Sequence, residues 1–146
     1  MPPETFWLGI KQFNQRQFYD CHDTLEAIWI EAPELDKRFY QGILQIAVGC
    51  YHLSNLNQQG AMILLGEGIK RLSEYQPVYY DIDVTQLVTK SYSLLTSLQK
   101  LSPNQLPTFT KELFGESPSN QDNPNSSPDF PGSNNQLPTI LICQQT

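Results

Sequence analysis

The stretch from Asp36 to Leu56, drawn as a helix, has apolar residues around most of its circumference. These residues are Phe39, Tyr40, Ile43, Leu44, Ile46, Ala47, Val48, Cys50, Tyr51 and Leu53. A helix that is apolar on nearly every side has to be covered by other elements on several sides. We therefore expect this helix to lie at the centre of an all-α domain.

The sequence predicts four more helices around this central one. Apolar residues recur at spacings of three and four, which is the period of an amphipathic helix. The expected helices cover about residues 4–16, 20–32, 58–75 and 84–101. Asp20 and Asp83 are expected N-caps, and Gly66 and Gly68 predict a close approach of two backbones. The predicted fold class is an all-α, antiparallel bundle of about five helices with a disordered C-terminal tail.

The composition of the chain changes near Ser102. Seven of the eleven prolines lie from Pro103 onward, and the stretch 115–136 has no Lys or Arg and almost no apolar residues. Such a stretch buries too little surface to offset its ordering entropy. We expect a helical domain over 1–102 and a largely disordered tail over 103–146, of which the part after Phe114 is expected to be dispensable for stability. The apolar residues 137–143 either dock on the domain in extended form or trail from it.

Charge and composition narrow the classes of partner. The chain has 15 acidic and 9 basic residues, a formal charge of −6, and no basic cluster, which argues against nucleic acid and membrane partners. No apolar run approaches the roughly 20 residues of a membrane span, and the N-terminus lacks the pattern of a signal peptide. Cys21, Cys50 and Cys143 lack metal-type spacing. Cys21 and Cys50 lie inside helical patterns, so we expect them to be small reduced core residues. We expect a cytoplasmic protein without a cofactor, either a monomer or a homodimer.

Polar residues on two of the expected helices could form a site. His22 lies among apolar residues of the second helix, with Glu26 one turn on and Trp29 on the same face. The central helix carries one narrow polar stripe, made of Arg38, Gln41, Gln45 and His52. If this stripe faces the second helix, the seven residues line an internal polar pocket. The alternative is that the stripe faces water, as every helix of a small bundle must do along some strip.

The same residues allow three hypotheses about function. The favoured hypothesis is a non-enzymatic domain that binds a protein partner or a small ligand through this His/Glu/Gln cluster. A metal-dependent hydrolase would use His22, Glu26 and His52 as metal ligands, with an open position for water. A structural scaffold would use the cluster only for internal hydrogen bonds. The sequence does not decide whether a metal binds, and it contains no nucleophile placed beside a base.

Three blocks of the sequence resemble a known family. They are the stretch 18–29, the stretch 38–72, and a proline followed by residues 81–84. Together they resemble the bacterial and plastid family catalogued as domain of unknown function 309 (DUF309), over about Phe13 to Leu101. The resemblance implies a small all-helical domain and no particular activity. The positions that carry the family's pattern are His22, Glu26, Trp29, Tyr40, Gly42, Gln45, His52, Gly60 and Ala61.

Overall fold

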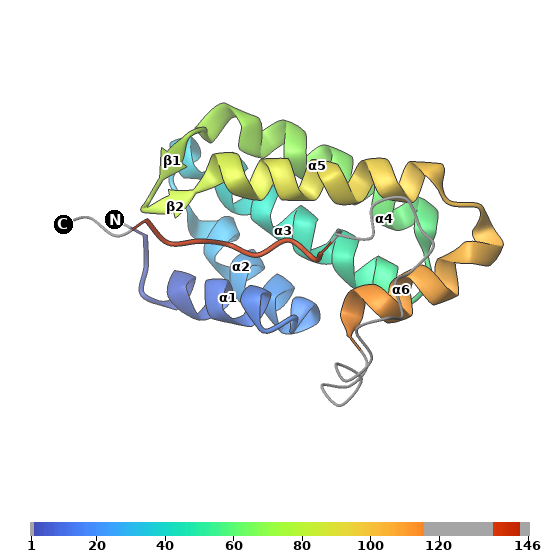
Figure 1. Ribbon diagram of the computed structural model, residues 1–146. Coiled ribbons are helices and arrows are strands. Elements are labelled where there is room, and N and C mark those ends of the chain that lie inside the picture. Colours follow the sequence, from blue (N-terminus) through green and yellow to red (C-terminus); the bar gives the residue numbers. More distant parts are fainter. Residues whose placement is uncertain (1, 116–135, 144–146) are drawn as a thin grey trace.

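The computed structural model describes residues 2–115 and 136–143, and these residues form a helical bundle (Figure 1). The α-helices are α1 (Thr5–Asn14), α2 (Phe18–Glu31), α3 (Glu34–Ser54), α4 (Gln58–Leu72), α5 (Val84–Lys100) and α6 (Leu106–Phe114). Two 3₁₀ turns, Ser73–Tyr75 and Pro103–Gln105, follow α4 and α5. The expected all-α class is confirmed, with a sixth helix beyond the five that the sequence predicted.

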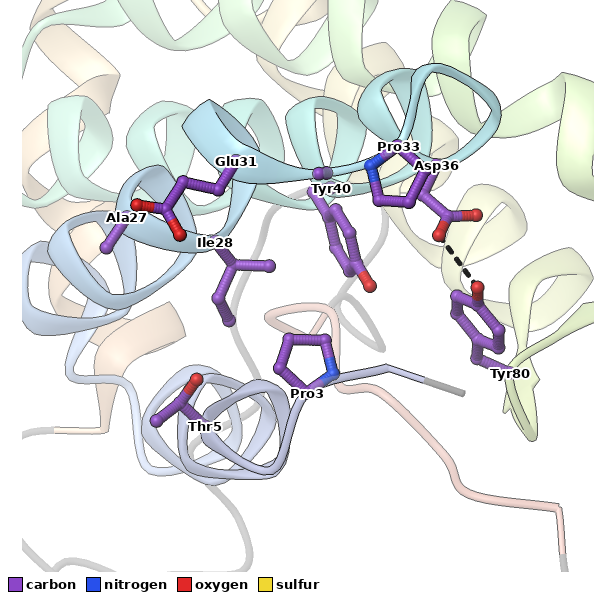
Figure 2. Close-up of a pocket in the computed structure, with 10 residues that line it drawn as sticks. Pro3, Thr5, Ala27, Ile28, Glu31, Pro33, Asp36, Tyr40 and Tyr80 are labelled. Atoms are coloured by element: carbon purple, nitrogen blue, oxygen red, sulfur yellow. Dashed lines mark hydrogen bonds between the residues drawn. The ribbon is translucent and has the colours of Figure 1, made fainter.

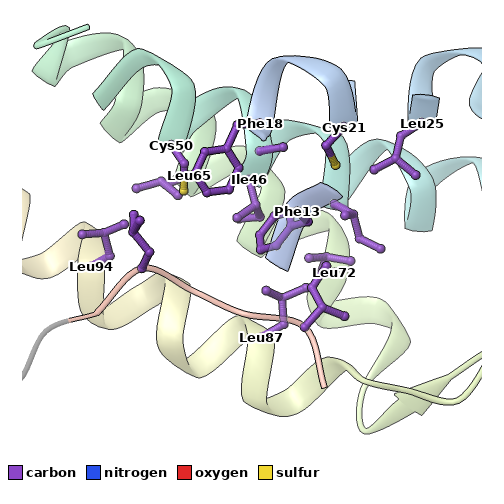
Figure 3. Packing of buried hydrophobic residues seen from close by; sticks show 14 of the residues in the cluster. Phe13, Phe18, Cys21, Leu25, Ile46, Cys50, Leu65, Leu72, Leu87 and Leu94 are labelled. Carbon is purple, nitrogen blue, oxygen red and sulfur yellow. The ribbon is translucent and has the colours of Figure 1, made fainter. Parts of the chain in front are cut away.

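The helix α3 is central, as its apolar circumference predicts. It packs against both α2 and α4, and it contributes more buried residues than any other described helix. Figure 3 shows Leu87 and Leu94 of α5 facing the core residues of the other helices. All of these residues belong to one hydrophobic cluster. In the described part of the chain, none of the helices has the length and apolar character needed to cross a bilayer.

The helices α3 and α4 approach each other at glycines. A Cβ atom added to Gly68 would lie 2.8 Å from the carbonyl oxygen of Gly42, and one added to Gly42 would lie 2.7 Å from Cγ of Leu72. The predicted close approach at Gly68 is therefore confirmed. At Gly66 the prediction is wrong, because no described atom of another segment lies within 4 Å of an added Cβ.

Two of the helix starts follow from local sequence. The Asp83 carboxylate accepts a hydrogen bond from the Gln86 amide at 3.0 Å, which confirms the predicted cap of α5. The Asn57 side chain caps α4 in the same way by accepting from the Gly60 amide at 3.0 Å. The predicted cap at Asp20 is wrong, because α2 begins earlier, at Phe18, and Asp20 lies in its first turn.

The thiols of α2 and α3 lie inside the core. Cys21 and Cys50 are fully buried, and all three cysteines are free. Burial raises the pKa of the Cys21 thiol to about 12. It also raises the pKa of Cys50, to which a smaller contribution comes from Cys21. Both side chains are therefore protonated and act as small core residues, as the sequence predicts.

A short hairpin connects α4 to α5. Its strands β1 (Val78–Tyr79) and β2 (Ile82–Asp83) are antiparallel, with Tyr79 opposite Ile82. Tyr80 and Asp81 form the turn, and both have positive φ angles, of 48° and 63°. This turn holds the Tyr79 and Tyr80 side chains beside the beginning of α3.

The last described residues, 136–143, form what we call the C-terminal strap, drawn in red in Figure 1. Leu137 and Ile140 are buried, and Ile142 pairs with Ile82 of β2 as an antiparallel bridge. The Asn14 side chain donates to the Ile140 carbonyl at 2.9 Å and accepts from the Ile140 amide at 2.7 Å. Of the two alternatives for these residues, the docked one is therefore correct.

The expected domain boundary after residue 102 also has to be corrected, because the folded domain continues beyond it. The helix α6 lies beyond it and buries Leu106, Phe109 and Leu113 in the common core. Its apolar residues are few but spaced at three and four, and Pro107 lies in its first turn, where a proline is tolerated. Residues 103–114 and 136–143 are thus part of the folded bundle. The predicted disorder of 116–135 lies outside the described residues.

Candidate functional site

The polar stripe of α3 faces α4. The Gln45 amide nitrogen donates to Glu67 at 3.0 Å, and its oxygen accepts from Nη1 of Arg71 at 3.1 Å. The Gln41 oxygen accepts from Nε of Arg71, also at 3.1 Å. The Arg38 guanidinium forms a bidentate ion pair with the carboxylate of Glu74, which lies beyond the end of α4. The polar atoms of this part of the stripe are therefore paired inside the protein.

His22 and Glu26 lie beside each other on α2, away from that network. Nε2 of His22 lies 3.8 Å from a Glu26 carboxylate oxygen, and Nδ1 lies 3.2 Å from Asp23. The His22 side chain is 30% exposed. His52 at the end of α3 contacts the Asn57 side chain at 3.4 Å. Each histidine therefore has its polar contacts in neighbouring sequence.

The expected pocket between α2 and α3 is a misinterpretation, because the buried face of α2 is rotated from the one assumed. The buried residues are Phe18, Cys21, Leu25 and Ile28, whereas the expected face joined Phe18 and Leu25 to His22 and Trp29. Trp29 is partly buried against the core, with the Lys37 ammonium 5.9 Å from its ring centre. The structure therefore separates His22 and Glu26 from Gln41 and Gln45.

The ligand set for a metal is also absent from the described residues. No group of three or more His, Cys, Asp or Glu side chains in residues 2–115 and 136–143 is arranged to hold a metal ion. His22, Glu26 and His52 do not form such a group. The metal-site hypothesis therefore has no geometric support in this part of the chain.

A different site lies where α2 ends and α3 begins. A cleft of about 520 Å³ opens there between α1, α2, α3 and the hairpin turn, as Figure 2 shows. It is lined by Pro3, Thr5, Ala27, Ile28, Glu31, Ala32, Pro33, Asp36, Tyr40 and Tyr80. Pockets for small ligands are typically about 300–1,000 Å³ in volume and combine apolar walls with a few polar groups. The cleft fits both criteria.

The central polar group of the cleft is the carboxylate of Asp36, which is only 6% exposed. Its Oδ2 atom accepts a hydrogen bond from the Tyr80 hydroxyl at 2.7 Å, and its Oδ1 atom accepts one from Tyr79. The bond to Asp36 is the main reason that the pKa of Tyr80 is raised. Burial first, and then Asp36, raise the pKa of Tyr79. Both tyrosines are therefore held as neutral hydrogen-bond donors to one carboxylate.

The Tyr40 hydroxyl is the second polar group of the cleft, and it differs from the Asp36 carboxylate in its hydrogen bonding. Tyr40 is 1% exposed, and within the part of the chain that the structure describes its hydroxyl forms no hydrogen bond. The hydroxyl is not among the described side-chain atoms that are both fully buried and unpaired, so it reaches the open space of the cleft. Burial, followed by the negative charge of Asp36, raises its pKa. Figure 2 shows the Tyr40 side chain reaching from α3 into the space between Ile28 and Tyr80. A hydroxyl in this position can pair with water or with a ligand that enters the cleft.

Sequence reasoning missed this site because it treated Asp36 only as the start of the central helix. One signal was available: Asp36 precedes Tyr40 by four residues, so the two side chains share a helix face that is otherwise apolar. The other half of the site, Tyr79 and Tyr80, lies more than forty residues further along the chain. No local pattern brings these tyrosines to Asp36.

Comparison with known proteins finds a family that matches the first part of the chain. Residues 6–64 match the family described as "Domain of unknown function (DUF309)", so the resemblance expected from the sequence is confirmed over α1, α2, α3 and the first half of α4. The chain is also similar to "Uncharacterized protein YpuF" from Bacillus subtilis (strain 168), with 38% identity over 58 residues. That match covers 39% of this chain and only 33% of the relative. No solved structure matches the chain.

The matched residues contain most of the cleft. Its lining residues from Ala27 to Tyr40 lie inside 6–64, whereas Pro3, Thr5 and Tyr80 lie outside. The Asp36 carboxylate and the Tyr40 hydroxyl therefore come from the matched part. Tyr79 and Tyr80, which position Asp36, come from a part that the family match does not cover.

Proposed function

We propose that this protein is a non-enzymatic binding domain and that its ligand is a small molecule held in the cleft beside Asp36. The observation that carries the proposal is the Tyr40 hydroxyl, the tip of a buried side chain, which faces the cleft and lacks a partner among the described residues. A ligand in the cleft can pair with this hydroxyl without displacing a hydrogen bond within the described part of the protein. The concave shape of the site favours a small molecule over a flat protein surface.

The residues predicted from the sequence take a secondary place in this proposal. Gln41 and Gln45 use their side-chain amides within the α3–α4 interface, so a ligand there would have to displace hydrogen bonds that already exist. Their proposed role is to fix α3 against α4, which holds Asp36 and Tyr40 of the same helix in position. The hydrolase hypothesis has no observation in its favour.

We also propose that the protein works in a reducing compartment such as the cytoplasm. The free cysteines support this proposal, since Cys21 and Cys50 are buried in the core as thiols. Labelling with a thiol reagent in the native state would test it. We expect Cys143 to react first and the two buried thiols to react only after unfolding.

The test of the binding function is a titration of the ¹⁵N-labelled protein with a mixture of small cationic, neutral and anionic compounds. We expect shifts of backbone amide signals at Ile28, Glu31 and Tyr40. The variant Ala27→Trp fills the cleft from the exposed side of α2 and is expected to abolish them. Asp20→Trp, at an exposed position of the same helix outside the cleft, is the matched control and should retain them.

Two results would contradict the binding function. The first is that no compound of any charge shifts the cleft signals. The second is that Ala27→Trp, still folded by its amide spectrum, shows the same shifts as the parent protein. In either case the structural-scaffold hypothesis would be the better description of the protein.

A further inference from the structure

We infer that the cleft binds a small organic cation, namely the ammonium group of an alkylamine, against the Asp36 carboxylate. This inference rests on the proposed binding function and adds the chemical class of the ligand. It follows from which polar atoms of the cleft are already used and which are still available.

The hydrogen-bond inventory of the cleft favours a ligand that donates. The Tyr79 and Tyr80 hydroxyls both donate their hydrogen to the Asp36 carboxylate. An ionised carboxylate has about four acceptor sites, so two donors leave about half of them unfilled. The lone pairs of the Tyr80 hydroxyl are acceptors as well. A ligand that meets these atoms has to bring its own hydrogens, and an ammonium group brings three.

The charge of the cleft favours the same class. Two of its ten lining residues, Glu31 and Asp36, are acidic, and none of the ten is Lys, Arg or His. The ammonium group of Lys37, which follows Asp36 in the chain, is directed elsewhere. It donates to the carbonyl oxygens of Trp29 and Ile30 at the end of α2, at 3.2 Å each. An anionic ligand would therefore meet two carboxylates without a cation in the lining to offset them.

The aromatic residues of the cleft supply the third argument. Tyr40 and Tyr80 line it, and aromatic rings attract cations through their negative faces. Ile28, Ala27 and Pro33 form the apolar part of the lining, which suits the alkyl chain of an amine. The free Tyr40 hydroxyl can then pair with the ammonium group or with another polar atom of the ligand. A carboxylate, aromatic rings and an apolar wall together describe a site for an amphiphilic cation.

The experiment uses three probes of one size and shape: n-butylammonium, n-butanol and butyrate. Each is titrated into the ¹⁵N-labelled full chain at constant ionic strength, with potassium chloride as the salt blank. We expect n-butylammonium to shift the amide signals of Ile28, Glu31 and Asp36, with at least about tenfold higher affinity than either other probe, a difference of about 1.4 kcal/mol.

Variants identify the group responsible. Asp36→Asn should weaken n-butylammonium binding by about tenfold or more, as expected when an ionic partner is lost. Because Asp36 is buried and its change can affect folding, Glu31→Gln provides a second variant at an exposed position, with an expected loss of about threefold. Glu112→Gln, an exposed carboxylate on α6 at the other end of the bundle (Figure 1), is the matched control and should bind like the parent.

The outcomes separate this inference from the function on which it rests. If n-butanol or butyrate shifts the cleft signals as strongly as n-butylammonium, the cation class is wrong and the binding function stands. If n-butylammonium binds equally well to the parent, Asp36→Asn and Glu31→Gln proteins, the carboxylates do not recognise it and the inference is again wrong. If none of the three probes and no compound of the mixture shifts the cleft signals, both proposals fail.

Discussion

The middle and the beginning of α3 are packed in different ways. Along its middle, α3 meets α4 through Gly42 and Gly68, and the polar groups at the edge of this interface pair with one another. At its beginning, α3 meets the hairpin turn through large tyrosine rings, and these leave a cleft of about 520 Å³ with the unpaired hydroxyl of Tyr40. The same helix is thus closed to ligands in one place and open in another.

The difference shows that a buried polar residue is a sign of a site only when its partners are counted. Gln45 and Asp36 are similarly buried, at 8% and 6% exposed. The Gln45 amide is satisfied on both sides by Glu67 and Arg71, which makes it a structural connection. The Asp36 carboxylate accepts hydrogen bonds from Tyr79 and Tyr80 and keeps acceptor sites that a ligand can fill. The predictions below test whether this contrast holds.

The largest effect is expected from Gly68→Ala. The added Cβ would lie 2.8 Å from the Gly42 carbonyl oxygen and from Cδ1 of Ile46, so α4 has to move away from α3. We expect a loss of about 3 kcal/mol in the free energy of unfolding, measured by urea denaturation.

Gly66→Ala is its matched control in the same helix. Nothing lies within 4 Å of the added methyl group, so the variant should gain up to about 1 kcal/mol from helix propensity alone. Equal effects of the two substitutions would show that the α3–α4 backbones are not in close contact.

The next effect concerns the polar network of the same interface. Gln45→Ala removes the acceptor of one Arg71 bond and the donor of the Glu67 bond, and we expect a loss of about 2 kcal/mol in stability. Gln59→Ala, at an exposed position of α4, should change stability by less than about 0.5 kcal/mol. A Gln45→Ala protein as stable as the parent would remove Gln45 from the set of structural residues.

At the cleft, two conservative substitutions should behave differently. Tyr80→Phe deletes a donor to the buried Asp36 carboxylate and should cost about 1.5 kcal/mol. Tyr40→Phe deletes a hydroxyl without a partner among the described residues and should change stability by less than about 0.5 kcal/mol. Thermal unfolding of both variants is the measurement. A Tyr40→Phe protein that loses as much as Tyr80→Phe would show that the Tyr40 hydroxyl is paired within the protein.

The smallest effect is on the alkaline limb of stability. The folded protein raises the pKa of Tyr79 and of Tyr80 above the unfolded value of about 10. Their contribution to stability is therefore complete below about pH 10 and is lost as the pH rises through the folded values. In Asp36→Asn the hydroxyls no longer face a charge, so the fall above pH 10 should be shallower. Asp20→Asn, on the surface of α2, should leave it unchanged in the same urea titrations.

Parts of the fold could be predicted because they are determined locally. The central position of α3 follows from its apolar circumference, and the start of α5 follows from one side chain, Asp83. The face of α2 could not be fixed in this way. Phe18 and Leu25 belong to both of its candidate stripes, and the choice between Cys21 with Ile28 and His22 with Trp29 depends on where α1 and α3 lie.

The candidate site depended even more on tertiary structure. A central helix has neighbours on several sides, so no local rule could tell that Gln45 faces α4 rather than α2. Asp36 becomes part of a site only in the folded protein, where the hairpin turn brings the Tyr80 hydroxyl to its carboxylate. The strap residues Leu137 and Ile140 lie in a composition that suggests disorder, and their burial is provided by the surface of the finished bundle.

The strap has a consequence for the order in which the protein folds. The Asn14 side chain and the Ile140 backbone are joined by two hydrogen bonds, although they are 126 residues apart in the chain. Closing so long a loop costs more entropy than forming the contacts between successive helices, and it is compensated only once the groove for Ile140 exists. The helices α1 to α6 therefore assemble before the strap is added. On a polypeptide made from the N-terminus, residues 136–143 emerge after α1 to α6, so the bundle of six helices has an open groove until these residues reach it.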